Sequence, residues 1–417
     1  MTASYTRFFC VLFLCAVSFA GAYAGENPRD GSITGLSVTG LKRTRLSAAQ
    51  RPLLKFIGLD AEGINYSDVW AAILNTGILE PVSVEILDTQ AGKVLAVTVR
   101  EKWSVFPVPI AAAGSGGWSF GAALYDANAF GYNDKLFLAG IYSSLRWLAT
   151  AGYFHVSPGG REPGWNGMVL FSREERHDCD QRDEDLRRFD VDTLSVRVGL
   201  NVSLPDNPDL FSASPSVFFE EKRLRNSENA LQGPDTSLRI FGFGSRLSLQ
   251  QSSWDGYLLS QEEATLQFSC RIANRGFMFQ IINFRGVWEK PLVPGFRVNV
   301  RTGLVFQPNV PILFEDSPSD AQVDILPHTF SAQHYAGASA GLEKYLVKIP
   351  AGTLSLDASY QVVYSRGSIL GDSLDHGVAG KLSFYLSRLA IPAVKVGAAY
   401  NVKEQYFQGA FSMGMSF

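Results

Sequence analysis

The sequence predicts a mainly β protein, in which an antiparallel transmembrane β-barrel of about sixteen strands follows one small α/β domain. Three observations carry this prediction. The chain begins with a secretory signal, side chains alternate with a period of two from Trp103 onward, and the last residue is Phe417. The predicted segments are a signal peptide at 1–24, the small domain at 32–103 and the barrel at 104–417.

The first 24 residues have the order of charges and apolar residues found in a cleavable signal peptide. Arg7 supplies the positive start, Phe8–Ala20 is apolar, and Ala22-Tyr23-Ala24 has small residues where a signal peptidase cleaves. The apolar run is shorter than the roughly 20 residues of a spanning helix. Cys15 raises the alternative of a lipid anchor, but Phe13-Leu14 before it lacks the small residues of a lipobox.

Residues 32–103 are predicted to form one soluble domain with the order β-α-α-β-β. Ile33–Thr44 alternates like a strand, and Ser47–Ile57 follows with apolar residues at Leu53, Leu54 and Ile57. Ser67 is expected to cap a second helix, because it precedes a run in which apolar residues share one face. Two strands complete the domain. The apolar face of the second helix is Val69, Trp70, Ile73 and Leu74. The two strands are Val82–Leu87 and Val94–Trp103.

From Trp103 to Phe417 the pattern changes to alternation of apolar with small or polar residues. In Leu194–Leu204 every second residue is apolar, and Arg197 lies on the opposite face. Such strands fit lipid outside and a wet lumen inside, although a soluble sandwich would alternate in the same way. The expected strand starts are 103, 117, 133, 145, 165, 188, 209, 236, 258, 276, 294, 334, 352, 376, 391 and 406.

Connection lengths support a barrel entered from the periplasm. If the small domain is periplasmic, connections alternate between the outer and inner rims, and short inner turns with long outer loops are typical of outer-membrane barrels. The expected inner turns are Pro205–Pro208, Ser253–Gly256, Pro291–Gly295 and Ile349–Gly352. The expected long outer loops are Arg173–Arg188, Leu224–Thr236, Pro308–Gln333 and Ser365–His376.

Composition and single residues give no sign of catalysis. The net charge of −3 argues against a nucleic-acid partner, and the two cysteines of the mature chain, Cys179 and Cys270, are widely separated. The cluster His177–Asp180 is expected to lie in a solvated outer loop and lacks metal-ligand spacing. We expect no enzyme activity, cofactor or metal. A hydrolase at the outer rim, using His328 or His376, is a weaker hypothesis that no motif supports.

Five short motifs follow one another in the order and spacing of a known family. They resemble the BamA/TamA family of outer-membrane assembly factors, also called the bacterial surface antigen family, over nearly the whole mature chain. The first two motifs resemble a POTRA module and the others resemble barrel strands and the first inner turn. The motifs are Thr39–Arg43; Leu74–Leu79 with Val82–Glu85; Glu101–Trp103 with Phe106–Pro109; Asp126–Gly131; and Leu382–Leu386 through Ile391–Ala393 and Ala398–Tyr400.

The resemblance implies a barrel whose first and last strands close weakly. Pro107 and Pro109 lack backbone donors in the first strand, while Gly409 and Gly414 loosen the last one. A client strand could then pair with the exposed edge. The alternative is that the prolines only mark where the first strand begins. Phe417 at the chain end is the residue with which many outer-membrane proteins terminate.

One outer loop departs from the family pattern. The family's sixth outer loop carries an Arg-Gly-Phe/Tyr tip that meets a carboxylate on the following strands, and this chain has Leu326–Thr329 and Val362–Ser365 at those places. Both halves of the contact are missing, which puts activity in doubt rather than the fold. Arg275-Gly276-Phe277 occurs in the expected fifth outer loop, where we interpret it as a coincidental turn.

The predicted function is insertion of outer-membrane proteins or their translocation to the surface. The POTRA module would capture client strands at the edge containing Val82 and Val84, and the weak seam would admit them. Expected partners are outer-membrane lipids, unfolded outer-membrane protein clients, and periplasmic lipoproteins or chaperones. The alternative is a passive pore or surface scaffold that retains the fold.

Overall fold

The computed structural model describes the chain from Gly31 to Met413, apart from gaps of at most eight residues. The described ranges are 31–90, 92–114, 117–155, 163–203, 210–228, 237–255, 258–315, 322–349, 352–367, 371–386 and 392–413. The predicted signal peptide and the terminal Phe417 lie outside them. No helix within these ranges is long and apolar enough to cross a membrane.

The chain divides into two compact units. One contains residues up to Lys42 together with Ala49–Asn75 and Leu79–Glu101, and the other contains Arg43–Ala48, Thr76–Ile78 and Lys102 onward.

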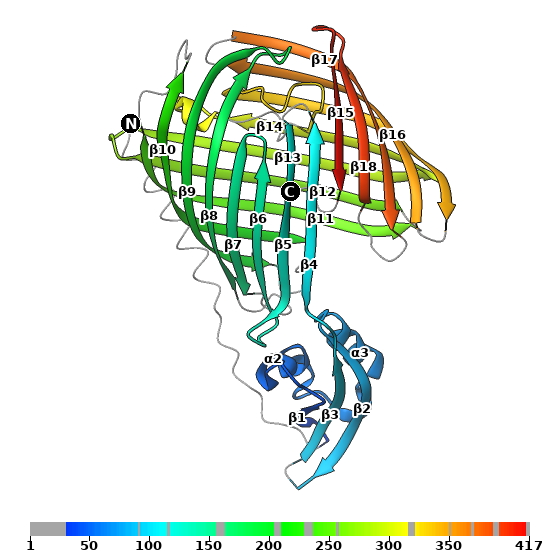
Figure 1. Cartoon of the computed structure of the whole chain (residues 1–417). Coiled ribbons are helices and arrows are strands. Elements are labelled where there is room, and N and C mark those ends of the chain that lie inside the picture. The colour runs from blue at the N-terminus through cyan, green and yellow to red at the C-terminus, as the bar shows by residue number, and fades with distance from the viewer. Residues whose placement is uncertain are drawn as a thin grey trace, which may run out of the picture. The chain divides into compact units, whose positions relative to one another are not determined.

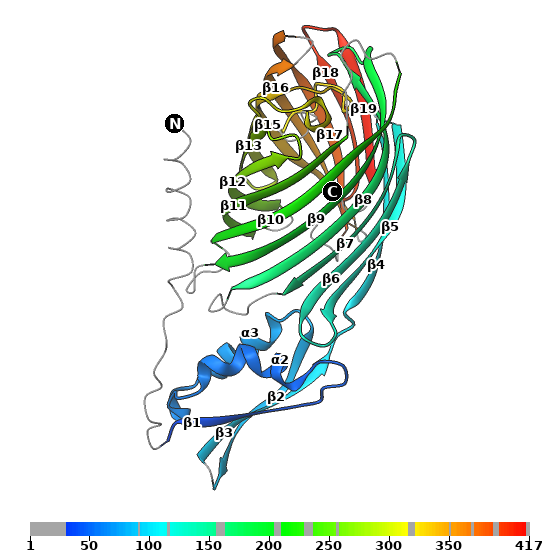
Figure 2. The ribbon, with the colours of Figure 1, turned by 90° about the vertical axis from the view of Figure 1, so that its left-hand side faces the viewer.

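The smaller unit contains a three-stranded sheet with the predicted element order β-α-α-β-β. The sheet order is β1-β3-β2, with β1 parallel to β3 and β2 antiparallel to it, so β1 and β2 are its edge strands. Figure 2 shows the helices on one face of this sheet. The elements are β1 Ile33–Thr39, α2 Leu46–Gln50, η1 Arg51–Phe56, η2 Ala61–Gly63, α3 Tyr66–Leu74, β2 Leu79–Thr89 and β3 Gly92–Glu101.

Two details of the predicted helices are wrong. The α3 helix is capped by Asn65, whose side chain accepts a hydrogen bond from the Ser67 backbone N–H, so Ser67 lies inside the first turn. The buried face of α3 is Val69, Ala72 and Ile73, and Trp70 is exposed. The helix thus begins two residues earlier than a cap at Ser67 implies, and Ala72 takes the place of Trp70 and Leu74 on its buried face.

The larger unit is a closed antiparallel barrel of sixteen strands, β4 to β19, which confirms the predicted architecture (Figures 1 and 2). Predicted strand starts differ from the observed ones by at most five residues, at 376 against Gly371. The strands are β4 Val105–Gly114, β5 Gly117–Ala129, β6 Asp134–Ser143, β7 Arg146–His155, β8 Gly164–Cys179, β9 Asp185–Ser203, β10 Phe211–Glu228, β11 Leu238–Asp255, β12 Leu258–Ala273, β13 Met278–Val293, β14 Phe296–Phe306, β15 His334–Ile349, β16 Gly352–Gly367, β17 Gly371–Leu386, β18 Pro392–Asn401 and β19 Tyr406–Met413.

The two faces of the barrel wall differ in polarity in the way that lipid outside requires. Large apolar side chains remain exposed on the outer face, whereas the inner face buries charged and polar groups. A soluble sandwich would bury its apolar rows instead. Exposed outer residues include Phe120, Leu138, Val198, Val217, Phe241, Leu266, Trp288, Val300, Leu342, Leu356, Leu382, Val396 and Phe407.

Two of the expected long outer loops are wrong because the strands extend further than predicted. β8 continues to Cys179 and β9 begins at Asp185, so the connection is 180–184 rather than Arg173–Arg188. β16 likewise reaches Gly367 and β17 begins at Gly371. Alternating charged residues extend these strands beyond the apolar band, which a hydropathy pattern cannot distinguish from a loop.

A buried charge network crosses the inner wall between β13 and β17. Arg297 pairs with Glu289 at 2.7 Å and with Glu343, which also accepts hydrogen bonds from Ser355 at 2.5 Å and Tyr385 at 3.2 Å. Both Arg297 and Glu343 are buried. The network joins strands through side chains as well as through backbone hydrogen bonds.

Replacing Arg297 by methionine should destabilise the barrel by roughly 3–5 kcal/mol, because the two carboxylates would remain buried without their partner. The measurement is urea unfolding of the purified protein in detergent micelles. Arg285→Met, at an exposed arginine on β13, is the matched control. Equal unfolding midpoints for the two variants would contradict this account of the network.

Candidate functional site

The seam between β4 and β19 has the fewest registered pairs of any barrel ladder within the described residues. Among the described residues, which end at Met413, only three pairs register: Phe411 with Ala113, Ser412 with Ala112, and Met413 with Ala111. By comparison, β4 pairs with β5 at ten positions and β19 pairs with β18 at eight. A typical hydrogen bond contributes about 0.5–1.5 kcal/mol, so a short ladder lowers the cost of separating the two strands.

The described residues leave the predicted weakening of the seam untested. Pro107 and Pro109 register with Leu124 and Ala122 on β5, and no described residue of β19 registers with either proline. Gly409 registers with Ala398 on β18. Gly414 and Phe417 lie outside the described residues. The effect of the two prolines on opening of the seam stays a prediction.

The connection between β14 and β15, called loop 6 here, enters the lumen. It comprises residues 307–333, of which 307–315 and 322–333 are described, and Figures 1 and 2 show it in yellow among the surrounding strands. Its first part contributes Val310, Leu313 and Phe314 to an apolar cluster with the inner faces of β9 to β13. Its second part packs against the opposite wall, and the residues of that cluster are Val305, Val323, Ile325, Leu326, Phe330, Ala332, Tyr335, Val363, Ala379 and Ala399.

A group of charges near the outer rim, called the outer clamp, holds the first part of loop 6. It consists of Arg176 and Asp178 on β8, Arg187 on β9 and Glu315 on the loop. Arg187 pairs with both Asp178 and Glu315, and all three are buried. Arg176 donates to Asp178 and to the Glu315 carbonyl, each at 2.6 Å. Buried partners of this kind are costly to separate.

A second group, called the inner clamp, holds the other part of the loop. Asp324 pairs with Lys381 on β17 at 2.7 Å and exchanges hydrogen bonds with Gln361 on β16, at 2.6 Å to its backbone N–H and 3.0 Å to its carboxylate. The Gln408 amide on β19 donates to the carbonyls of Asp324 and Leu326. Loop 6 is thus bonded to the strand that forms one side of the seam.

The Asp324 carboxyl of the inner clamp has a lowered pKa. Burial would raise the pKa of the Asp324 carboxyl, but the Lys381 ammonium and the hydrogen bond from Gln361 outweigh it and hold the pKa below its ordinary value. When the folded protein lowers the pKa of a carboxyl, the charged pair contributes its full stabilisation at pH values above the ordinary pKa of that carboxyl. This stabilisation is lost only as the pH falls through the lowered pKa. The attachment of loop 6 should therefore not respond to pH changes around neutrality.

The polarity of these clamps is the reverse of the family contact, both halves of which are missing from this sequence. The loop supplies the carboxylates Glu315 and Asp324, and the wall supplies the cations Arg187 and Lys381. At the places where the family contact was sought, Leu326 and Val363 meet in an apolar cluster. Sequence reasoning missed these pairs because it looked only for the family's own residue types. The alternation of β17 already placed Lys381 on the inner face, whereas Arg187 fell within an expected outer loop.

Two further predictions are settled by position. Most of the cluster His177–Asp180 is not a solvated loop: His177 to Cys179 end β8, Asp178 belongs to the outer clamp, Cys179 is buried, and only Asp180 lies in the connection to β9. Arg275-Gly276-Phe277 forms the turn between β12 and β13, the fifth outer connection, as expected. Gly276 adopts a positive φ of 79° there, which a glycine allows at no steric cost.

The predicted client-binding edge is an edge strand in the smaller unit. Val82 is 57% exposed and falls at a register shift between Pro81 and Ser83, whereas Val84 pairs regularly with Val97. A bulge next to a proline discourages pairing with another chain, so the regular part of this edge begins at Ser83.

Comparison with known proteins identifies the type of barrel. No protein-family model and no curated protein sequence matches this chain. BamA from Haemophilus ducreyi lacking POTRA domains 1–3 aligns with a TM-score of 0.67 at 12% identity, covering 92% of this chain and 84% of that one. The barrel has the BamA-type fold. The resemblance predicted from sequence motifs is thereby confirmed for the fold.

Two CdiB structures support the same conclusion. CdiB from Acinetobacter baumannii aligns with a TM-score of 0.64 at 12% identity, covering 93% of this chain and 74% of that one. CdiB from Escherichia coli aligns with a TM-score of 0.62 at 14% identity, covering 93% and 77%. At these identities the likeness establishes a BamA-type fold alone.

Reversing one charge of the inner clamp should release loop 6 from this BamA-type lumen. Lys381→Glu places two carboxylates together at Asp324, so ion conductance in planar bilayers should rise, whereas Lys381→Glu combined with Asp324→Lys should restore the low value. Arg285→Glu, a charge reversal at an exposed arginine on β13, is the control. A double variant as conductive as the single one would show that the pair does not hold the loop.

Proposed function

We propose that this protein is an outer-membrane factor that inserts client proteins into the membrane or translocates them to the surface. The observation that carries this proposal is the seam between β4 and β19, where three pairs register among the described residues. Unpaired backbone groups in lipid are costly, so a partly unpaired strand edge favours the addition of another strand. The similarity to BamA and CdiB supports the same class of activity.

The remaining parts of the proposal follow the direction of the chain. The smaller unit would act as a single POTRA module in the periplasm, offering the edge of β2 from Ser83 onward to unfolded clients and to periplasmic lipoproteins or chaperones. The barrel would lie in the outer membrane with its exposed apolar face toward lipid. We propose no enzymatic activity. Loop 6 in the lumen weighs against the alternative of an open, passive pore.

Locking the seam should abolish the activity. In a background with Cys179→Ser and Cys270→Ser, Ala112→Cys and Ser412→Cys place two thiols at one registered pair of the seam. When the protein is reconstituted in liposomes, the oxidised form should fail to accelerate folding of a test barrel, and reduction should restore the acceleration. The ladder must separate for a client strand to enter.

The control variant shares one cysteine with the seam variant. Ala112→Cys with Ser119→Cys joins β4 to β5, where the ladder is not expected to open. This variant should accelerate folding whether it is oxidised or reduced. Undiminished acceleration by the oxidised seam variant would refute the lateral route. Steady conductance without acceleration by the unmodified protein would favour a passive pore.

A further inference from the structure

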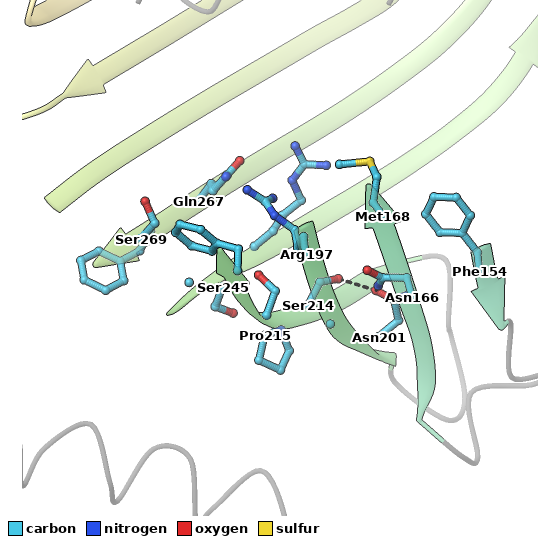
Figure 3. A pocket seen from close by; sticks show the side chains of 16 residues that line it. Phe154, Asn166, Met168, Arg197, Asn201, Ser214, Pro215, Ser245, Gln267 and Ser269 are labelled. Carbon is cyan, nitrogen blue, oxygen red and sulfur yellow. Dashed lines mark hydrogen bonds between the residues drawn. The ribbon is translucent and has the colours of Figure 1, made fainter. Parts of the chain in front are cut away.

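A hollow of about 340 Å³ lies in the inner wall across strands β7 to β12, away from the two clamps (Figure 3). The wall is hollowed here because small residues pair with one another across neighbouring strands. Gly199 on β9 pairs with Ser216 on β10, and Gly244 on β11 pairs with Ser269 on β12. Ser216 also pairs with Gly244, so the four small residues are neighbours across four consecutive strands. The hollow is therefore a feature of the strand register rather than a gap left by a loop.

Two arginines line this hollow, and no carboxylate does. Within the described part of the chain, Arg197 makes no ion pair and its Nε atom is buried without a hydrogen-bond partner. Arg246 is exposed toward the lumen. By contrast, the nearby Arg271 is neutralised by Glu220 at 3.0 Å. Buried polar groups are normally satisfied, so an orphan guanidinium nitrogen beside a cavity points to a missing acceptor.

The other side chains of the hollow restrict what that acceptor can be. The Arg197 guanidinium lies 5.3 Å from the centre of the Phe218 ring, and Phe154, Met168 and Pro215 add apolar surface. A bare phosphate would leave this apolar surface without contact. A polypeptide carrying acidic and apolar side chains would use both, since guanidinium groups bind carboxylates with two parallel hydrogen bonds.

We propose that the hollow binds an acidic segment of an extended polypeptide, with a carboxylate between Arg197 and Arg246 and an apolar side chain against Phe218. Neutral donors on the neighbouring strands, among them Asn166 and Gln267, would hydrogen-bond to the peptide backbone. The inference rests on the proposed function, which brings unfolded client chains to the barrel. It adds a preference for the sequence of the client.

The test measures peptide binding directly. Fluorescein-labelled peptides of alternating Glu and Leu are titrated with the full-length protein in detergent micelles, and a matched peptide carries Gln in place of Glu. The acidic peptide should bind, and Arg197→Gln or Arg246→Gln should each weaken its binding about tenfold, as expected for loss of a charged hydrogen-bonding partner. Lys395→Gln removes an inner-face charge from β18, outside the hollow, and should leave the affinity unchanged.

Several outcomes would overturn the assignment. The first is that the Gln peptide binds as tightly as the Glu peptide. The second is that both arginine variants bind the Glu peptide as tightly as the wild type does. The third is that millimolar inorganic phosphate displaces the peptide from the wild type and from the arginine variants at the same phosphate concentration. Heat-modifiable gel mobility identifies variants that have not folded, and Arg197→Lys, which keeps a charge, should then retain part of the affinity.

The liposome folding assay separates this inference from the proposed function. If the unmodified protein accelerates folding but does not bind the peptide, the assignment of the hollow is wrong and the proposed function is retained. Peptide binding without acceleration has the opposite meaning, because the hollow is then confirmed and the insertion activity is not.

Discussion

The structure depends on the need of every strand in a lipid-facing sheet to find a hydrogen-bonding neighbour on both sides. Closure of sixteen strands meets this need around the barrel, with ladders of eight or more registered pairs on either side of the seam strands, yet β4 and β19 meet at only three described positions. In lipid an unpaired backbone group cannot form its hydrogen bond with water instead. A strand edge with few partners is therefore the place where another strand gains most by joining.

Loop 6 connects this seam to the rest of the lumen. Its two parts are clamped to opposite walls by ion pairs, and the amide of Gln408 bonds the loop to β19 itself. The family contact between a loop arginine and a wall carboxylate is absent, but a loop carboxylate and a wall lysine occupy an equivalent role with opposite signs. The absence of a motif did not mean the absence of the interaction, since electrostatic attraction is indifferent to which side carries which charge.

Much of the barrel could be predicted because each strand faces lipid on one side, which imposes a period of two on the sequence. The strand starts followed from this period to within five residues. The ends of β8 and β16 did not, because charged residues extend both strands past the apolar band. The clamps and the Arg197 hollow join residues of distant strands, such as Arg187 and Glu315, so no local pattern could show them. The predicted cap at Ser67 was wrong by two residues, because the side chain of Asn65 caps the helix instead.

Hydrogen–deuterium exchange in lipid nanodiscs tests the central claim most directly. If the seam is the weakest ladder, backbone amides of Tyr406–Met413 should exchange faster than those of any interior barrel strand, such as β11 or β12, because exchange requires local opening. Protection of β19 equal to that of β11 and β12 would show that the barrel is closed as firmly at the seam as elsewhere, and would contradict this account.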